Sequence, residues 1–164
     1  MSTINKENSD NQFLTFYVAD DMYALSVSYI EEIIEYSIVT KVPLMPKCIS
    51  GITNIRGNVI PVIDLGIRLG LSNTQSINKR TSIIVIKKKD DIKDFQVGLI
   101  VDEVHKVYNI FTKEQENTPT FGSKIRKEFI EHIGKVDGQF IPILNSSALI
   151  NVEELSQVSD AKEI

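Results

Sequence analysis

Few side chains in this chain of 164 residues have the type and spacing that acid–base or nucleophilic chemistry needs. A hydrolase of the serine or cysteine type requires a nucleophile, a base and an acid that orients the base. The available bases are His105 and His132, and Cys48 is the single cysteine. His132 shares a strand face with isoleucines in the expected register, which favours a packing role, and Cys48 has the setting of a small buried hydrophobe. The residues therefore predict no catalytic centre, and a small hydrolase using His132 is the disfavoured alternative.

Metal and cofactor chemistry also lacks the spacing that it needs. Two histidines and one cysteine that lie far apart in the sequence do not form a zinc site. The acidic pairs Asp20-Asp21 and Asp90-Asp91 lack the glycine and the ligand spacing of a calcium loop. No glycine-rich phosphate-binding sequence is present. We therefore predict that the chain uses no cofactor and no metal.

Composition excludes further classes of function. Hydrophobic residues make up 42% and charged residues 24% of the chain, which is typical of an ordinary globular protein. The net charge of −4 offers no basic excess for nucleic acid or for an anionic membrane surface. A single cysteine fits a reducing compartment, and neither a signal peptide nor an 18-residue apolar run is present. These features predict a cytoplasmic protein without membrane insertion.

The elements that must position any functional residue begin with a predicted hairpin at residues 49–65. A glycine in the short link between its two β-branched runs supplies the positive φ of a tight turn. The central pair of that turn is either Arg56-Gly57 or Gly57-Asn58. Ile55 and Ile60 share one face of the hairpin in both registers, because a two-residue shift leaves the faces unchanged.

The remainder of the chain reads as many short strands with few helices. Strands are expected at residues 13–18, 23–27, 38–42, 81–86, 95–101, 104–110, 129–136 and 139–144. A capping box at residues 28–31, followed by isoleucines at helical spacing, predicts a short helix through Ile34. Further helical turns are expected at residues 66–70, 124–127 and 148–155, with loops at residues 87–94 and 117–123. This pattern favours a barrel or a sandwich over an α/β fold.

One segment of the predicted hairpin is repeated later in the chain. Residues 57–64 match residues 138–145 in the pattern G-x-x-I-P-[VI]-[IL]-[DN], 81 residues apart. Both copies lie at expected hairpins, so the match predicts two related β units. Each copy contains a proline within a strand, Pro61 or Pro142, which predicts that each of these strands lies at a sheet edge or at a bulge.

Several of these segments together resemble the CheW-like family of bacterial chemotaxis coupling proteins. The resemblance rests on ISGITNIRG at residues 49–57, IPVIDL at residues 60–65 and GLIVDEV at residues 98–104. It extends from about Gln12 to Leu155. It implies an all-β fold of two SH3-like five-stranded β-barrels packed together, with a few short helices.

The same resemblance implies a domain organisation. Residues 1–11 are expected to form a flexible N-terminal tail, and residues 156–164 a C-terminal tail. Residues 12–155 are expected to form a single domain of two β-barrel subdomains, with strands partly shared between the N-terminal and C-terminal segments.

The function implied by the resemblance is that of a non-catalytic scaffold. Such a protein couples the cytoplasmic tips of chemoreceptors (methyl-accepting chemotaxis proteins) to the C-terminal regulatory domain of the histidine kinase CheA, and it is recruited to membrane-associated receptor arrays. Residues that contact the kinase cannot be assigned from the motifs. The residues that match the receptor-contacting region of the family are Ile30, Glu32, Gly51, Asn54, Arg56 and Gly57.

Alternatives remain open at this point. Arg56 is either a solvated turn charge or an anchor for a partner. Ser50 replaces a lysine that family members often have, and Glu103 replaces a common glycine, so a specialised paralogue that serves another array is an alternative. A CheV-type coupling module or an isolated domain of CheA is another. The absence of a receiver pattern after the domain, and the N-terminal methionine, favour a separate coupling protein.

Overall fold

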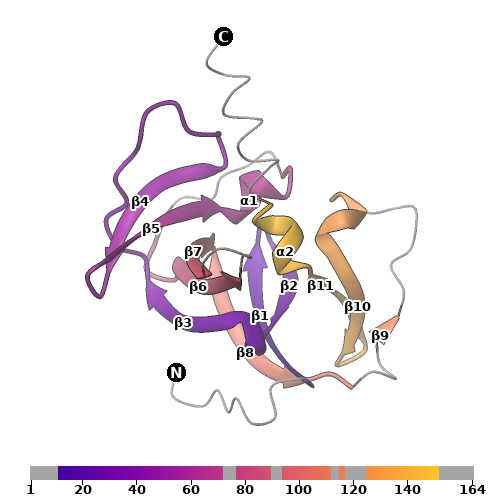
Figure 1. Ribbon diagram of the computed structural model, residues 1–164. Helices are drawn as coiled ribbons and strands as arrows, with labels where there is room; N and C mark the ends of the chain where they lie inside the picture. Colours follow the sequence, from indigo (N-terminus) through magenta and orange to yellow (C-terminus); the bar gives the residue numbers. More distant parts are fainter. Residues whose placement is uncertain (1–10, 72–76, 90–93, 112–114, 117–124, 152–164) are drawn as a thin grey trace.

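The structure is a computed structural model that describes residues 11–71, 77–89, 94–111, 115–116 and 125–151 (Figure 1). Strands dominate the fold and the helices are single turns. The strands are β1 (Gln12–Val18), β2 (Asp21–Ser26), β3 (Ile30–Glu35), β4 (Ile49–Ile55), β5 (Asn58–Asp64), β6 (Ser82–Lys89), β7 (Asp94–Val101), β8 (Glu103–Asn109), β9 (Gln115–Glu116), β10 (Ile130–Val136) and β11 (Gln139–Leu144). The helical turns are α1 (Leu65–Arg68), α2 (Ser146–Leu149) and two 3₁₀ turns, η2 (Val27–Tyr29) and η4 (Lys127–Phe129).

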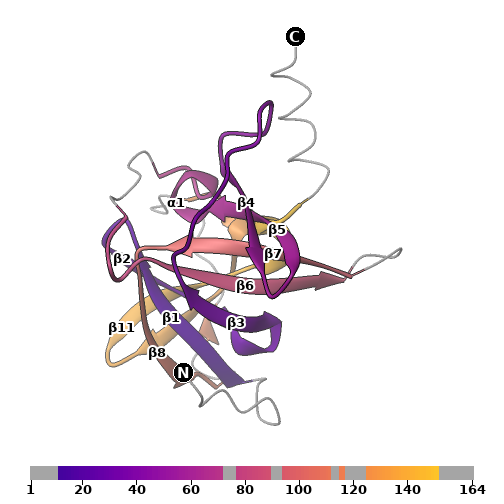
Figure 2. The same cartoon turned by 90° about the vertical axis from the view of Figure 1, so that its left-hand side faces the viewer.

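The strands form two sheets that combine segments from both halves of the sequence (Figures 1 and 2). The first sheet has the order β8-β1-β2-β11-β10-β9, and the second has the order β3-β6-β7-β5-β4. Two parallel pairings, β2 with β11 and β5 with β7, join strands that are distant in the sequence. The prediction of an all-β fold of two SH3-like barrels is confirmed. The first sheet has a sixth strand because the two-residue β9 extends it.

The repeated segments adopt the same local structure. The β4–β5 turn is Arg56-Gly57, with φ of 54° and 85°, since Ile55 pairs with Asn58. The β10–β11 turn is Asp137-Gly138, with φ of 50° and 80°. Positive φ at both central residues is the geometry of a type I′ turn, whose twist matches that of the flanking strands.

A capped helical turn follows each of these hairpins. Asp64 Oδ1 accepts a hydrogen bond from the Ile67 amide at 3.2 Å, and α1 begins there. Asn145 Oδ1 accepts one from the Ala148 amide at 3.2 Å at the start of α2. An oxygen at this position satisfies an amide that has no partner within the helix.

The strands that contain the prolines are not sheet edges, but each pairs across a bulge close to its proline, in β4 between Ile49 and Gly51 and in β10 between Ile130 and His132. Pro61 pairs with Ile52 in a regular part of the β4–β5 ladder, and β5 is an interior strand. The parallel ladder between β5 and β7 includes only the residues from Val62 onward. Pro142 likewise precedes Ile143, where β11 pairs with β2. Each proline is tolerated because it stands where the parallel ladder ends, so its missing amide costs no ladder hydrogen bond.

The predicted short helix through Ile34 is wrong, because only η2 is helical and β3 follows it. A register shift between Ile30 and Glu32 places an extra residue in β3 opposite β6. The bulge leaves Ile30 and Ile33, three residues apart, in contact with the same core, while Ile34 packs on the opposite face. Helical spacing of isoleucines therefore arises here from a bulged strand that is covered on both faces.

Smaller differences concern element ends. The strand expected at residues 38–42 is a single bridge between Thr40 and Ile52. The turn expected at residues 124–127 lies at η4, and the helix expected at residues 148–155 begins earlier, as α2. Residues 87–89 belong to β6. The remainder of the loop expected at residues 87–94 up to residue 93, the loop at residues 117–123 and the chain after residue 151 lie outside the described residues.

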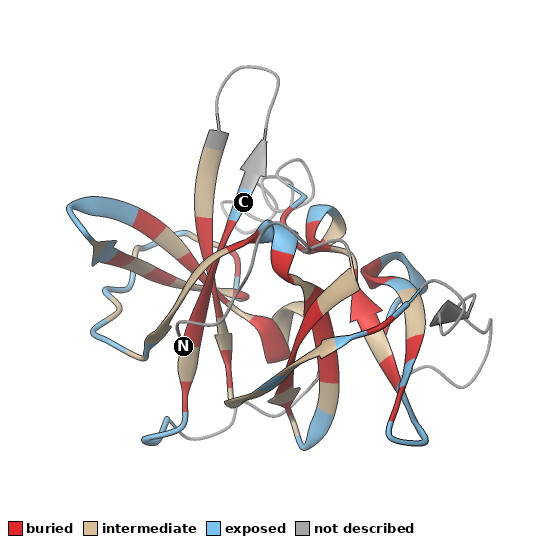
Figure 3. Ribbon diagram, turned by 90° about the horizontal axis from the view of Figure 1, so that it is seen from below, coloured by how far each residue is buried: buried red, intermediate tan, exposed pale blue. Residues whose placement is uncertain are grey.

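The buried hydrophobic side chains form three clusters. Figure 3 shows buried residues along the strands of both sheets. A large shared cluster, which includes Phe16 and Leu25 of the first sheet and Leu99 of the second, is buried between them. The opposite face of each sheet carries a smaller cluster of its own. These clusters comprise Phe13, Ala24, Ile110, Val136, Ile141 and Ile143 for the first sheet, and Ile60, Val62, Ile83 and Val85 for the second. The shared cluster stabilises the two barrels as one unit, because removing either sheet would expose it to water.

Arg68 connects the two capped turns. Its Nε donates a hydrogen bond to the Leu149 carbonyl at 2.7 Å, and its Nη2 donates one to the Ala148 carbonyl at 2.9 Å. The guanidinium also lies 4.8 Å from the centroid of the Phe129 ring. Arg68 on α1 thus satisfies carbonyls at the end of α2 and stacks on an aromatic residue of the second half.

We predict that Arg68→Ala lowers the free energy of unfolding by about 2 kcal/mol, because two charge-assisted hydrogen bonds are lost. Arg68→Lys keeps the charge but cannot reproduce the planar fork, so an intermediate loss is expected. Urea unfolding followed by circular dichroism measures both. Identical midpoints for the two variants and the unmodified protein would show that the contact does not stabilise the fold.

Candidate protein-binding site

The structure brings Glu32 and Arg56 together, two of the residues that sequence reasoning assigned to receptor binding. Arg56 Nη2 lies 3.0 Å from Glu32 Oε2. Strands β3 and β4 are the two opposite edges of the second sheet, so the contact requires this sheet to curve back on itself. The Arg56 side chain remains 81% exposed, whereas that of Glu32 is 24% exposed. An ion pair with one partner so exposed contributes little stability, and it leaves most of the guanidinium available to another molecule.

Asn54 and Gly57 support the conformation of Arg56. Arg56 has φ of 54°, a left-handed conformation that is unfavourable for a residue with a Cβ atom. The Asn54 Oδ1 accepts a hydrogen bond from the Gly57 amide at 3.0 Å across the turn. Gly57 supplies the second positive φ without strain. The arginine is therefore presented on a tight turn whose backbone is fixed by its neighbours.

Ile30 and Gly51, the other residues assigned to this site from the sequence, are buried. Ile30 is 1% exposed and packs in the shared core. Gly51 has φ of 151°, and a Cβ atom added there would lie 2.1 Å from the Thr40 carbonyl oxygen. The structure therefore places these two residues where they support the strands around the tip. Their assignment as contact residues stays a prediction.

An open groove of about 510 Å³ adjoins the tip, and sequence reasoning did not find it. Its lining includes Ile38, Ile52, Asn54 and Val59. Ile38 is 86% exposed and Val59 is 62% exposed, which is unusual for aliphatic side chains so close together. In the sequence, Val59 was the signal for this groove, because strand alternation places this apolar residue on the outer face of the hairpin, beside Asn54. Only the tertiary structure shows that Ile38 lies at the same groove.

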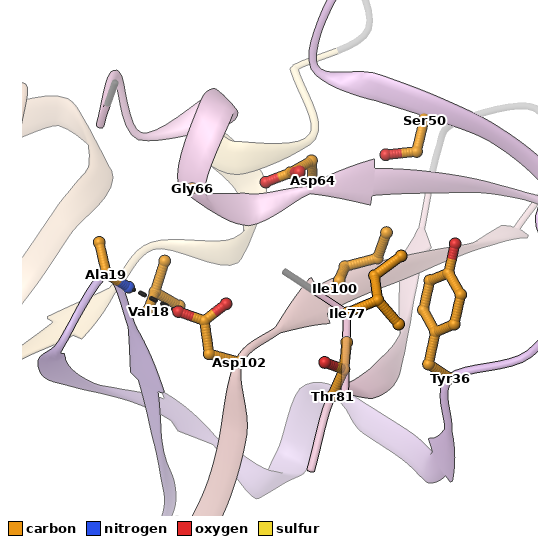
Figure 4. A pocket seen from close by; sticks show the side chains of 10 residues that line it. All are labelled: Val18, Ala19, Tyr36, Ser50, Asp64, Gly66, Ile77, Thr81, Ile100 and Asp102. Carbon is orange, nitrogen blue, oxygen red and sulfur yellow. Dashed lines mark hydrogen bonds between the residues drawn. The ribbon is translucent and has the colours of Figure 1, made fainter. Parts of the chain in front are cut away.

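A smaller cavity of about 100 Å³ lies near the start of α1 and is lined by two carboxylates (Figure 4). Asp102 Oδ2 accepts a hydrogen bond from the Ala19 amide at 2.8 Å. Burial raises the pKa of Asp64 above its ordinary value of 3.8, and hydrogen bonds from the Ile67 and Gly66 amides only partly oppose this. Burial also raises the pKa of Asp102, and the charge of Asp64 raises it further.

The histidines lie in packed surroundings. Tyr108 Oη and His105 Nε2 are 3.4 Å apart, and the Tyr17 ring meets the His105 ring edge-on. His132 is half-buried and pairs with Ile143, as the expected register requires. Within the described ranges, no group of three histidine, cysteine or acidic residues could hold a metal ion. No helix in the same part of the chain is long and apolar enough to cross a membrane.

The structure thus consists of two packed β-barrels with an exposed arginine on a tight turn beside an open groove. Comparison with known proteins shows the family to which the chain belongs. The family model of the CheW-like domain matches residues 12–154. The chain belongs to the CheW-like domain family.

Individual relatives cover nearly the whole chain. The chemotaxis protein CheW of Bacillus subtilis is 34% identical over 87% of this chain and 88% of its own length. The chemotaxis protein CheW of Thermotoga maritima is 33% identical over 92% of this chain and 94% of its own. The crystal structure of the scaffolding protein TtCheW from Thermoanaerobacter tengcongensis superposes with a TM-score of 0.78, at 33% identity, over 87% of this chain and 88% of that one. The chain is thus a chemotaxis scaffold or adaptor of a non-catalytic family.

We predict that Gly51→Ala lowers the free energy of unfolding by about 3 kcal/mol, through a backbone clash and a strained φ. Gly70→Ala is the matched control, because Gly70 also has positive φ, of 82°, but a Cβ atom there would meet no described atom within 4 Å. The control is expected to lose about 1 kcal/mol. Equal losses in thermal or urea unfolding would show that the approach of Thr40 to Gly51 is not what requires glycine.

A second prediction concerns pH. Because the folded state raises the pKa of Asp64, the folded state binds more protons than the unfolded chain above about pH 4, and stability falls as pH rises through the folded-state pKa. Asp64→Asn removes this loss and keeps the helix cap, as Asn145 does at the equivalent position. Urea unfolding at several pH values should show a flatter pH dependence and higher stability at pH 7. A variant that is less stable at pH 7, with an unchanged slope, contradicts the proposed cost of charge burial.

Proposed function

We propose that this protein is a cytoplasmic coupling protein that links the tips of chemoreceptors to the histidine kinase CheA in membrane-associated arrays. Membership of the CheW-like family supports the proposal, and the observation that carries it is the exposed Arg56 on a fixed turn. Residues 12–155 act as the coupling module in this proposal, and residues 1–11 and 156–164 are tails. The regulatory domain of the kinase and the receptor tip are its two partners.

The receptor contact is proposed at the Arg56 tip. A guanidinium can bind a carboxylate through two parallel hydrogen bonds, and the fixed turn limits the entropy lost on binding. Exchange of Glu32 for a receptor carboxylate costs little, because the ion pair is solvent-exposed on the arginine side. Glu32 orients the side chain before binding. Asn54 and Gly57 hold the turn, and Ile30 and Gly51 support the strands beneath it.

Signal transfer through such a module depends on rigidity. The large shared core and the contact of Arg68 with the end of α2 join the two barrels. A displacement of the receptor at the Arg56 tip is therefore passed to the kinase as a movement of the whole module. Local melting of a strand would dissipate the same displacement.

We predict that Arg56→Ala weakens binding to the receptor tip about thirtyfold, as loss of a central arginine anchor of about 2 kcal/mol implies. Arg56→Lys should restore only part of the affinity, because it keeps the charge and loses the fork. Calorimetric titration and receptor-dependent kinase autophosphorylation measure the two consequences.

Arg80→Ala provides the matched control for this experiment. Arg80 is similarly exposed, at 74%, and its Nη1 lies 3.9 Å from Glu103 Oε2. The control should bind and activate as the unmodified protein does. If Arg56→Ala retains both receptor affinity and kinase activation, Arg56 is a solvated turn charge and the proposed contact is wrong.

A further inference from the structure

The outer edge of β4 is only partly occupied. β4 is an edge strand of the second sheet. At Ile52 its outward amide and carbonyl both bond to Thr40, at 2.9 and 2.8 Å. Outward-facing backbone groups recur at every second residue of an antiparallel edge strand. The next outward amide and carbonyl therefore belong to Asn54. Asn54 and Val59 form a pair of the hairpin without hydrogen bonds between them, so the backbone groups of Asn54 point away from β5.

The segment that covers Ile52 stays beside β4 at Thr53, through Ser37 and Ile38, but it does not continue the backbone ladder to Asn54. By antiparallel register, Ile38 would be the residue opposite Asn54 if the bridge at Thr40 continued. Instead the Ile38 carbonyl accepts a hydrogen bond from Thr53 Oγ1 at 2.8 Å. The Asn54 backbone is left facing solvent, and Asn54 is exposed. An open strand edge of this kind is a template for another extended segment.

Aliphatic side chains form part of the wall of the groove beside this edge. Ile38, Ile52 and Val59 line it together with Ser37, Thr40, Thr53 and Asn54. Side chains of an added strand alternate between the two faces, so one of them would lie in this groove while its backbone bonds to Asn54. The two features, an open backbone edge and an aliphatic groove, thus match the same kind of occupant.

Charge defines the occupant further. The chain as a whole has a net charge of −4, yet residues 36–63 contain no aspartate or glutamate. The same stretch contains Lys41 and Lys47, which are exposed, whereas the charge of Arg56 is paired with Glu32 of β3 and is assigned to the receptor. A partner segment with carboxylates is therefore favoured at this edge over a basic one.

We propose that the open edge of β4 at Asn54 binds an extended segment of the kinase regulatory domain that is aliphatic and acidic and adds to the sheet as a further strand. The inference rests on the proposed function, because it assigns the chemistry of one of its two partners. Arg56 at the end of the edge then contacts a receptor carboxylate while the groove holds the kinase, so the two partners bind side by side on one hairpin.

The test compares Asn54→Pro with Asn54→Ala. Both variants lose the side-chain bond to the Gly57 amide, but only proline also removes the outward amide of the edge. Proline is tolerated on the solvent side of an edge strand, and equal melting temperatures of the two variants verify this. Asn54→Pro is expected to bind the purified kinase regulatory domain about tenfold more weakly than Asn54→Ala, the effect of one backbone hydrogen bond. Hydrogen exchange of the Asn54 amide in the unmodified protein should slow when that domain is added.

Other results overturn the inference. If the kinase domain binds, yet the two variants bind it equally and the Asn54 amide exchanges as before, the edge is not used and the proposed coupling function still stands. The edge is likewise not used, and the proposed coupling function still stands, if the two variants differ only in binding to the receptor. If the kinase domain does not bind the unmodified protein, the proposed function fails, and a peptide of alternating valine and glutamate becomes the probe. A saturable shift of the Asn54 amide signal with this peptide, and none with its lysine counterpart, supports the edge chemistry; no shift overturns it.

Discussion

The fold depends on the pairing of the N-terminal strands β1 and β2 with strands from the C-terminal part of the chain. β1 pairs with β8 and β2 pairs with β11, so the first sheet combines two separated segments, whereas the second sheet consists of the consecutive strands β3 to β7. The first barrel therefore cannot be completed by a contiguous piece of sequence, and the large core between the sheets forms only when both are present. Cooperativity between the barrels follows from this connectivity. The contact of Arg68 with α2 adds to it at the point where both halves turn into their capped helices.

The same constraint bears on the anchoring role that is proposed for Arg56. The β4–β5 hairpin is fixed by β7 on one side and by the bridge to Thr40 on the other. Arg56 extends from its tip in a conformation that its neighbours impose, so its backbone loses little freedom when it binds. Its pairing with Glu32 is strong enough to orient the guanidinium and weak enough to be exchanged.

Sequence patterns predicted the structural features that residues close together in the sequence determine. The two hairpins, their positive-φ turns and the shared face of Ile55 and Ile60 follow from glycine placement and strand alternation. Tertiary context decided the rest. Bulged β3 shows helical spacing because its isoleucines contact a hydrophobic cluster on each face, and Pro61 is tolerated in an interior strand because the parallel ladder ends beside it. A motif match could not separate Arg56, which is exposed, from Ile30, which supports the site from the core.

Repetition of the hairpin does not give the chain two equivalent binding surfaces. The positions that correspond to Arg56 and Val59 in the second hairpin are Asp137 and Phe140, so the charge at the tip is reversed. Phe140 is 58% exposed, and Lys135 Nζ lies 5.8 Å from the centroid of its ring. A carboxylate that is attracted to the first tip is repelled by the second, although both tips have the same backbone. The two hairpins thus share the same backbone conformation, and the side chains at their tips determine which partner each can accept.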